Sequence, residues 1–370
     1  MSTKEFLKQA WYAAAWSDEV KHELLTRTII KEPVLLYRRE DGTPVAMGNV
    51  CPHRFAPLNR GKLLGDVVQC PYHGLRFNSI GQCVHIPHGD GTVSQKMAVP
   101  SYPVVERHKL IWVWMGNPAD ADPATIPDFS CHEDDELAFV GGMLEVDANY
   151  KLVVDNLMDL SHAATVHEGL LSMPGLYTSK LETIQRGTTV YANKWMPDGE
   201  IQPAHAMLWK DHVPGENCDQ WAYMRWDAPA HLLLDVGVTK VGAPRAKGIF
   251  MYGTDVLTPK DEFTTYYFWG VTRNYDIDNE VANAQWREII KMAFDGQDKP
   301  MIEAQQKVLG ERDIEDMNPV MFSADTGSMR ARRVLAGLIR DKGTPQPQIV
   351  PLRSHRHEVE SSINPVLPAI

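Results

Sequence analysis

Two short segments of this chain each carry one cysteine and one histidine, in the same order. One residue lies between Cys51 and His53, and after sixteen intervening residues Cys70 and His73 follow, with two residues between them. Four such side chains form one metal site, and a zinc site with two cysteines and two histidines is the competing interpretation. Zinc fingers usually keep their cysteines together and their histidines together. Here each segment has one cysteine and one histidine. This arrangement instead favours a [2Fe–2S] cluster in which the two cysteines bind one iron and the two histidines bind the other.

The residues around these segments indicate short strands joined by tight turns. A hairpin is predicted over residues 34–47, because Asp41 and Gly42 separate two apolar runs. Strand-like runs at 75–77 and 82–85 follow the second segment. The predicted cluster is therefore of the Rieske type and lies in an all-β domain. Three cysteines remain, and we expect them to be small buried apolar residues: Cys83, Cys131 and Cys218.

A second pattern lies further along the chain, where His162 and His167 follow Asp159. An iron(II) site that binds dioxygen uses two neutral imidazoles and one carboxylate on one face, and leaves its other positions open. Asp159 and His162 are three residues apart and would share one face of a helix. His167 would point elsewhere, so we expect the helix to be irregular or to end near Ala164. Alone, the pattern also fits a helix with one buried and one surface histidine.

Length and composition limit what else the chain can be. With 370 residues it is too long for one ordinary core, so two domains are expected. The net charge of −11 argues against nucleic acid or an anionic membrane surface as a partner. No apolar run has the length of a membrane span, and the N-terminus lacks a secretory pattern. We therefore expect a cytoplasmic protein.

A turn-rich run at 116–123 predicts the linker between the two domains. We expect a first domain over residues 1–120, a second over 121–345 and a tail over 346–370. In the second domain, β-branched and aromatic residues predict five strands, at 188–195, 221–226, 231–238, 248–257 and 263–272. Helices are predicted at 276–296 and 328–342.

Together these motifs resemble the oxygenase component of the Rieske non-haem iron oxygenases. Within that family the chain is similar to the O-demethylases that act on vanillate and dicamba, through residues 51–58, 155–162 and 270–274. The resemblance extends over roughly residues 8–340. It implies an α+β fold, in which an N-terminal all-β Rieske domain precedes a helix-grip catalytic domain, an antiparallel sheet with helices.

The resemblance also assigns the carboxylate of the mononuclear iron. With His162 and His167 as the other ligands, it implies Asp298 as the third. Asp298 could instead only cap a helix that continues through a proline at position 300. The rival carboxylates are Asp295 and Glu303.

For Asp159 the resemblance implies a bridging role. Its carboxylate would accept hydrogen bonds from a cluster histidine of an adjacent subunit and from an iron-ligand histidine, most plausibly His162, in a head-to-tail homotrimer. Asn156, on the same helix face, would line the oxygen site. Each could also be a residue of the helix surface.

A chain of this kind would pass electrons from the Rieske cluster to Fe(II), which activates O2. NADH would supply them through a separate flavin and iron–sulfur reductase, because this chain has no Gly-x-Gly-x-x-Gly fingerprint. The expected reaction is O-demethylation of a methoxylated aromatic, with release of formaldehyde. The alternatives are ring or side-chain hydroxylation, an electron carrier without a second iron, and a non-enzymatic helix-grip ligand-binding protein.

The resemblance places two acidic residues, Asp235 and Asp255, at or near the substrate pocket. Two carboxylates there would repel a benzoate, which makes dicamba a poor candidate substrate and leaves a phenol, a neutral ether or an amine open. The alternative is that both side chains point away from the pocket.

Overall fold

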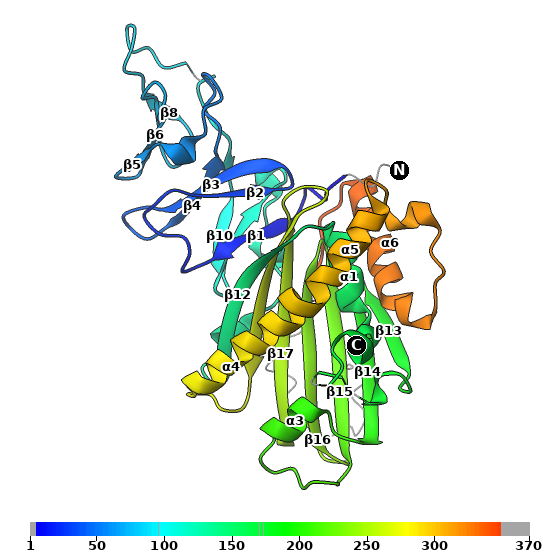
Figure 1. Ribbon diagram of the computed structural model, residues 1–370. Coiled ribbons are helices and arrows are strands. Elements are labelled where there is room, and N and C mark those ends of the chain that lie inside the picture. Colours follow the sequence, from blue (N-terminus) through cyan, green and yellow to red (C-terminus); the bar gives the residue numbers. More distant parts are fainter. Residues whose placement is uncertain (1–4, 95, 170, 173, 349–370) are drawn as a thin grey trace.

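The computed structural model describes residues 5–94, 96–169, 171–172 and 174–348. Its N-terminal part consists of antiparallel strands in three small sheets (Figure 1). The strand orders are β1–β11–β10, β2–β3–β4–β9 and β5–β6–β7–β8. The bounds are Trp11–Trp16 (β1), Leu25–Ile29 (β2), Glu32–Arg38 (β3), Pro44–Gly48 (β4), Lys62–Leu64 (β5), Val67–Gln69 (β6), Arg76–Phe77 (β7), Cys83–His85 (β8), Ser101–Tyr102 (β9), Val104–Arg107 (β10) and Leu110–Trp114 (β11).

The predicted hairpin is confirmed as β3 and β4. Tyr37 pairs with Val45 across the two strands. Between them Gly42 has a φ of +84°, a backbone conformation that glycine adopts without strain. The Asp41 side chain accepts a hydrogen bond from the Thr43 amide at 2.9 Å, which fixes the turn.

The second part is built on one seven-stranded antiparallel sheet, with the order β12–β18–β17–β16–β15–β14–β13. The bounds are Ala138–Val146 (β12), Leu181–Arg186 (β13), Thr189–Gly199 (β14), Cys218–Asp227 (β15), His231–Lys240 (β16), Ile249–Pro259 (β17) and Thr265–Arg273 (β18). The five predicted strands are confirmed as β14 to β18. An all-β part followed by a sheet with helices confirms the predicted α+β class.

The two edge strands of this sheet were not predicted. β13 is short and half-exposed, and its charged residues hide the alternation that marks a strand. β12 contains Gly141 and Gly142, which also weaken the strand signal. Their small size has a packing reason, because a Cβ on Gly142 would lie 2.5 Å from the Trp269 ring and a Cβ on Gly141 would lie 3.0 Å from the Trp16 ring.

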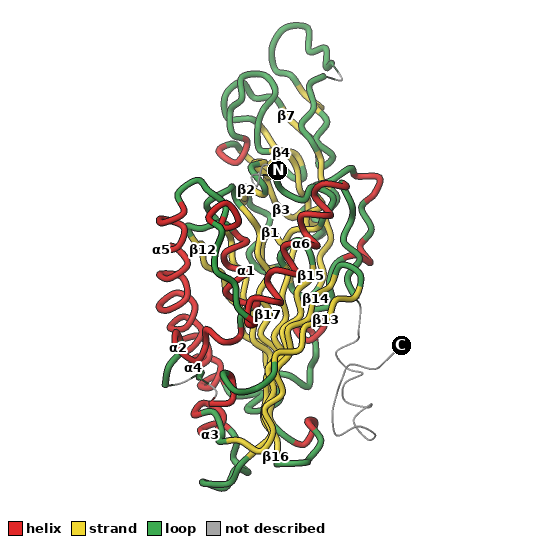
Figure 2. Tube along the Cα trace, turned by 90° about the vertical axis from the view of Figure 1, so that its right-hand side faces the viewer, coloured by secondary structure: helices red, strands yellow, loops and turns green. Residues whose placement is uncertain are grey.

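Helices cover one side of the sheet, with α1, α4 and α5 running along it (Figure 2). The bounds are Tyr150–Met158 (α1), Ala163–Val166 (α2), Pro203–Leu208 (α3), Glu280–Ile290 (α4), Lys299–Leu309 (α5) and Thr326–Asp341 (α6). A π-helical segment, Lys291–Asp298, joins α4 to α5 without a break. The helix predicted at 276–296 therefore begins later than expected and continues much further, whereas the one predicted at 328–342 is confirmed as α6.

The N-terminal and C-terminal parts pack against each other through β1. The hydroxyl of Thr258 donates to the Ala13 carbonyl at 2.7 Å, and a ring nitrogen of His231 lies 3.0 Å from the Trp11 carbonyl. Ile111 and Val140, one from each part, belong to the same hydrophobic core. The domain boundary at residue 120 stays a prediction, and most of the predicted tail lies outside the described residues.

Within the described part of the chain, no helix is both long enough and apolar enough to cross a lipid bilayer. The cytoplasmic location stays a prediction.

Candidate functional site

Three predicted ligands converge on one point beside the sheet. Nε2 of His167 lies 3.2 Å from one carboxylate oxygen of Asp298, and Nε2 of His162 lies 3.6 Å from the other. The possible ligand atoms of these three residues all lie within 4.8 Å of one another. They come from segments more than a hundred residues apart in sequence, on the short turns after α1 and at the end of the π-helical segment.

A break in the backbone at Asp159 positions His162. α1 ends at Met158, and the Asp159 side chain accepts a hydrogen bond from the Ser161 amide at 2.9 Å, which starts a separate 3-10 turn. Nδ1 of His162 donates to the Asp159 carbonyl at 2.5 Å, so that Nε2 faces Asp298. The prediction that Asp159 and His162 share a face of one helix is therefore wrong, although the expected irregularity is present.

The hydrogen bond of His162 also differs from the expected one. Its Nδ1 pairs with the main-chain carbonyl of Asp159, whereas the Asp159 carboxylate accepts hydrogen bonds from the amide and the hydroxyl of Ser161. A main-chain carbonyl fixes the tautomer and ring orientation of a ligand histidine as well as a carboxylate does. The second partner predicted for Asp159, a histidine of another subunit, is not tested by a single chain.

Asp298 does not cap a helix, because the chain around it is already helical and its side chain forms no capping hydrogen bond. It ends the π-helical segment, and Pro300 follows two residues later. Proline has no amide to donate to the preceding turn, and a π-helical segment accommodates this loss while it changes the direction of the side chains. The rival carboxylates lie elsewhere: Asp295 pairs with Lys299 at 3.5 Å, and Glu303 accepts from the Asp147 amide.

Two amide side chains hold the cluster of ligands in position. Nδ1 of His167 donates to the Gln297 side-chain oxygen at 2.8 Å, which directs Nε2 toward Asp298. Nδ2 of Asn156 donates to Asp298 at 3.3 Å, while its buried Oδ1 has no hydrogen-bond partner among the described residues. Burial alone would lower the pKa of His167, but the adjacent Asp298 carboxylate raises it above its ordinary value.

This donor set fits a mononuclear iron. Two imidazoles and one carboxylate on one side form the facial triad of non-haem iron(II) sites. Asp298 is almost fully buried, and a buried carboxylate requires a nearby positive charge. His162, His167 and Asp298 could therefore hold Fe(II), with its other positions open toward the cavity that they line.

The four predicted cluster ligands also lie together. Cys51 follows β4 closely and Cys70 directly follows β6, and the rings of His53 and His73 are 4.5 Å apart between centroids. The thiols are close enough to interact, and burial, as the main cause, raises the pKa of Cys51 to about 11. A bound iron would reverse that effect, because it stabilises the thiolate.

Each of these two loops turns back in the same way. Phe55 and Gly74 have positive φ angles of 57° and 73°, and their amides donate to the carbonyls of Cys51 and Cys70. The loops thus present each cysteine inward and each histidine toward the tip, and this arrangement fits a [2Fe–2S] cluster with two thiolate and two imidazole ligands.

A cavity of about 120 Å³ lies beside the three iron-ligand candidates. An engineered protein cavity of about 150 Å³ binds benzene, so the space suits a single aromatic ring. Asp255 lines this cavity and is 3% exposed. It accepts a hydrogen bond from the Tyr267 hydroxyl at 2.7 Å. Burial raises the pKa of Asp255 to about 7, and the negative charge of Asp298 adds to the shift.

Asp235 does not line the cavity, which is a correction to the expected pocket. Its neighbours Leu234 and Val236 in β16 do, because successive side chains of a strand point to opposite faces. On the far face, Asp235 accepts a hydrogen bond from the Trp221 indole at 2.7 Å and pairs with Arg245.

Several residues of the site were not predicted. Gln297 stands beside a predicted ligand and could have been found as a second partner for a metal-binding histidine. Tyr267 contacts Asp255 only through the pairing of β17 with β18. His205 lines the cavity from α3, where no sequence pattern marks it.

Comparisons with known proteins agree with this arrangement. Residues 10–103 match the Rieske [2Fe-2S] domain family, and residues 146–341 match the vanillate O-demethylase oxygenase C-terminal domain family. The chain is 39% identical to the oxygenase component of dicamba O-demethylase from Stenotrophomonas maltophilia, over 90% of this chain and 98% of the relative. It is 38% identical to the oxygenase component of chloroacetanilide N-alkylformylase from Rhizorhabdus wittichii, over 92% of this chain and 98% of the relative.

Solved structures give the same result. The crystal structure of dicamba monooxygenase bound to dicamba superposes with a TM-score of 0.84 at 39% identity, over 91% of this chain and 98% of the other. The structure of dicamba monooxygenase with non-haem iron and dicamba superposes with a TM-score of 0.77 at 37% identity, over the same shares. The chain therefore belongs to the family of Rieske non-haem iron oxygenases, as an oxygenase component with the C-terminal domain of the vanillate O-demethylases.

Proposed function

We propose that this chain is a terminal oxygenase that removes the methyl group from a methoxylated aromatic compound. One observation carries the proposal: His162, His167 and Asp298 form a triad that opens onto a mostly apolar cavity of the size of one aromatic ring. Relatives named dicamba O-demethylase and vanillate O-demethylase support the choice of O-demethylation within the family.

In this proposal Cys51, Cys70, His53 and His73 hold the Rieske cluster, and the triad holds Fe(II). When bound, the cluster supplies single electrons and the Fe(II) supplies the activation of O2. The residues of the chain set the geometry of the site: Gln297 and the Asp159 carbonyl orient the two imidazoles, and the mostly apolar lining would pack against the substrate ring.

The reaction balances with one O2 and two electrons. One oxygen atom enters a C–H bond of the methoxy carbon, and the other leaves as water with two protons. The resulting hemiacetal breaks its C–O bond to give a phenol and formaldehyde. NADH provides the two electrons through a separate reductase, in keeping with relatives that are named as oxygenase components.

We also propose that the cluster of one subunit delivers electrons to the iron of the next in a head-to-tail homotrimer. Within one chain, the β5–β8 lobe projects beyond the end of the seven-stranded sheet (Figure 1). At the tips of the cluster loops, Phe55 and Tyr72 are 77% and 65% exposed. Apolar side chains so exposed beside two histidines suit a covered protein contact. Asp159 would lie on the receiving side of that contact.

Complementation between two variants tests the trimer. His73→Ala would lack a working cluster and Asp298→Ala would lack the mononuclear iron. Electron transfer between subunits predicts that mixed trimers of the two regain part of the turnover, whereas transfer within a subunit predicts none.

Formaldehyde release tests the reaction. Purified protein with NADH, a compatible flavin and iron–sulfur reductase and a panel of methoxylated aromatics should produce formaldehyde in step with NADH oxidation. Asp298→Ala serves as the matched control, because it should keep the cluster absorbance and lose the product. If the assay yields a hydroxylated product and no formaldehyde, the reaction is ring or side-chain hydroxylation and not O-demethylation.

A further inference from the structure

The cavity beside the triad has few polar groups besides the three iron-ligand candidates. Among its described lining residues these are Gln202, His205 and Asp255, and the rest are hydrophobic or glycine. None of the described lining residues is lysine or arginine. A carboxylate or sulfonate bound here would lose its hydration without gaining a cationic side chain, and such burial is costly.

His205 has an unused hydrogen-bonding atom. The residue is 6% exposed, and its Nδ1 is buried without a hydrogen-bond partner among the described residues. Burial lowers the pKa of His205 to about 4, so the imidazole is neutral near pH 7. Unpaired buried polar atoms are rare in folded proteins and usually have a partner that is not protein, such as water or a ligand.

The neighbouring Gln202 contrasts with His205. Its side-chain amide donates to the Leu171 carbonyl at 2.5 Å, and its main-chain amide donates to the Gln220 side chain at 2.8 Å. Gln202 therefore forms hydrogen bonds that connect the start of α3 to Leu171 and Gln220. His205, in the short helix that follows Gln202, lines the cavity and keeps Nδ1 without a partner among the described residues.

The charges around the cavity favour an uncharged occupant. Fe(II) held by two neutral imidazoles and the Asp298 carboxylate carries one net positive charge. That positive charge would favour the ionised form of Asp255, which lines the same cavity, and an ionised Asp255 would balance it. An added anion would then leave this mostly apolar site with a net negative charge.

On the basis of the proposed function, we propose that the substrate is an uncharged methoxylated phenol, whose hydroxyl forms a hydrogen bond with Nδ1 of His205. A phenol hydroxyl both donates and accepts, so it can pair with Nδ1 in either tautomer of the imidazole. Asp255 and the lack of lysine and arginine in the lining would select against aromatic carboxylates and sulfonates.

Binding without turnover tests this selectivity. Isothermal titration calorimetry of the holoenzyme, without NADH, would compare methoxybenzene with its ortho, meta and para phenols and with the corresponding methoxybenzoates. One hydrogen bond to a buried partner predicts that at least one methoxyphenol binds about tenfold more tightly than methoxybenzene. The methoxybenzoates should bind more weakly than the best methoxyphenol.

Variants separate the role of His205 from general damage to the cavity. His205→Phe keeps a ring of similar size and should remove the advantage of the phenol while methoxybenzene still binds. His205→Asn, whose side-chain oxygen lies near the place of Nδ1, should restore part of it. Met207→Ala, at a site 77% exposed on the same helix, is the matched control and should change nothing. Asp255→Asn should strengthen methoxybenzoate binding relative to methoxyphenol binding.

The outcomes distinguish this inference from the proposed function. Tighter binding of a methoxybenzoate than of every methoxyphenol, or an unchanged preference in His205→Phe, would overturn the inference even if formaldehyde forms. Selective phenol binding that depends on His205, without formaldehyde from any ether, would uphold the inference and overturn O-demethylation.

Discussion

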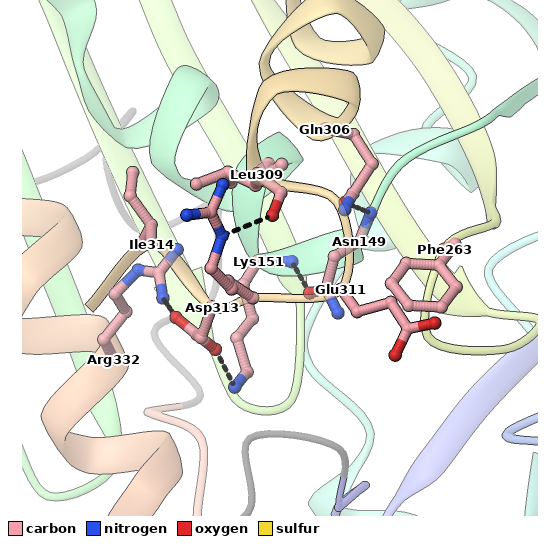
Figure 3. Close-up of a pocket in the computed structure, with 11 residues that line it drawn as sticks. Asn149, Lys151, Phe263, Gln306, Leu309, Glu311, Asp313, Ile314 and Arg332 are labelled. Carbon is pink, nitrogen blue, oxygen red and sulfur yellow. Dashed lines mark hydrogen bonds and ion pairs between the residues drawn. The ribbon is translucent and has the colours of Figure 1, made fainter. Parts of the chain in front are cut away.

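Arg332 lies at the centre of a buried ion network that fixes α1, and its replacement by methionine gives the most direct test of what holds the site in place. Its guanidinium forms a two-pronged contact with Asp155, at 2.6 and 2.8 Å, and a further contact with Asp313 at 3.2 Å. Lys151 contacts the other oxygen of Asp313, and Figure 3 shows Asp313 between Arg332 and Lys151. Asp155 directly precedes Asn156, which contacts Asp298.

The expected loss follows from the burial of the partners. Arg332, Asp155 and Asp313 have side chains that are 10%, 23% and 7% exposed. Removing one partner of a buried ion pair costs about 3–5 kcal/mol. Asp155 keeps some solvent and Asp313 keeps Lys151, so we expect about 3 kcal/mol for Arg332→Met. At about 2 °C per kcal/mol for a large chain, the thermal midpoint should fall by roughly 6 °C.

Thermal unfolding at fixed metal content measures this loss, and a double variant tests its cause. Asp155→Leu combined with Arg332→Met replaces the ion pair by apolar groups and should be more stable than Arg332→Met alone. Burial raises the pKa of Asp155 and the charge of Arg332 opposes the shift. The deficit of Arg332→Met should therefore shrink as the pH falls, because a protonated Asp155 needs no counter-charge. A single variant within about 1 kcal/mol of the parent, or a double variant equal to the sum of the singles, would refute the argument.

Three further predictions concern the site. Asp159→Asn should retain both metals, measured by iron content and cluster absorbance, and lose about 10–100-fold in turnover; normal turnover would remove the bridge role. Gln297→Leu removes the partner of His167 and should weaken iron binding by about 10–100-fold in a chelator competition, with the cluster spectrum unchanged. The folded-state pKa of Asp255 is raised from 3.8 to about 7. Relative to Asp255→Asn, the parent should therefore lose stability as the pH rises between these values and show no further change above them, which unfolding at several pH values would detect.

The strands of the central sheet could be predicted because their residues alternate or run apolar over the right length. The prediction failed at the two edges, where the physical signal is weaker. β13 pairs with only one neighbour and keeps a charged, half-exposed surface. β12 contains two glycines that leave room for aromatic rings, Gly142 for Trp269 and Gly141 for Trp16, and these contacts form only on folding. The pattern of a segment predicts which of its residues are buried in a regular strand. It does not predict which bulky residue of a distant segment will pack against them.

The iron ligands were harder to predict from the sequence, because no local rule connects Asp298 with His162. Resemblance to the family pointed to Asp298, while local rules suggested a helix cap before Pro300. The structure has a continuous helix with a π-helical segment in place of a cap. A proline in a helix can mark a start, a kink or a wider turn, and tertiary packing decides among them.

Asp235 and Asp255 illustrate a further limit, because both were assigned to the pocket by position along the chain. Side chains alternate between the two faces of a strand, so an error of one residue in alignment moves a side chain to the other face. In β16 the cavity receives Leu234 and Val236, and Asp235 instead pairs with Arg245 on the far face. Asp255 in β17 lies on the cavity face with Gly253 and Met251, two and four residues away. In the register of β16 with β17, Leu232 pairs with Asp255 and Leu234 pairs with Gly253. Asp255 therefore lies on the same face of the sheet as Leu234, and Asp235 lies on the opposite face. Asp255 can therefore contact a molecule in the cavity, whereas Asp235 pairs with Arg245 and Trp221 on the opposite face of the sheet.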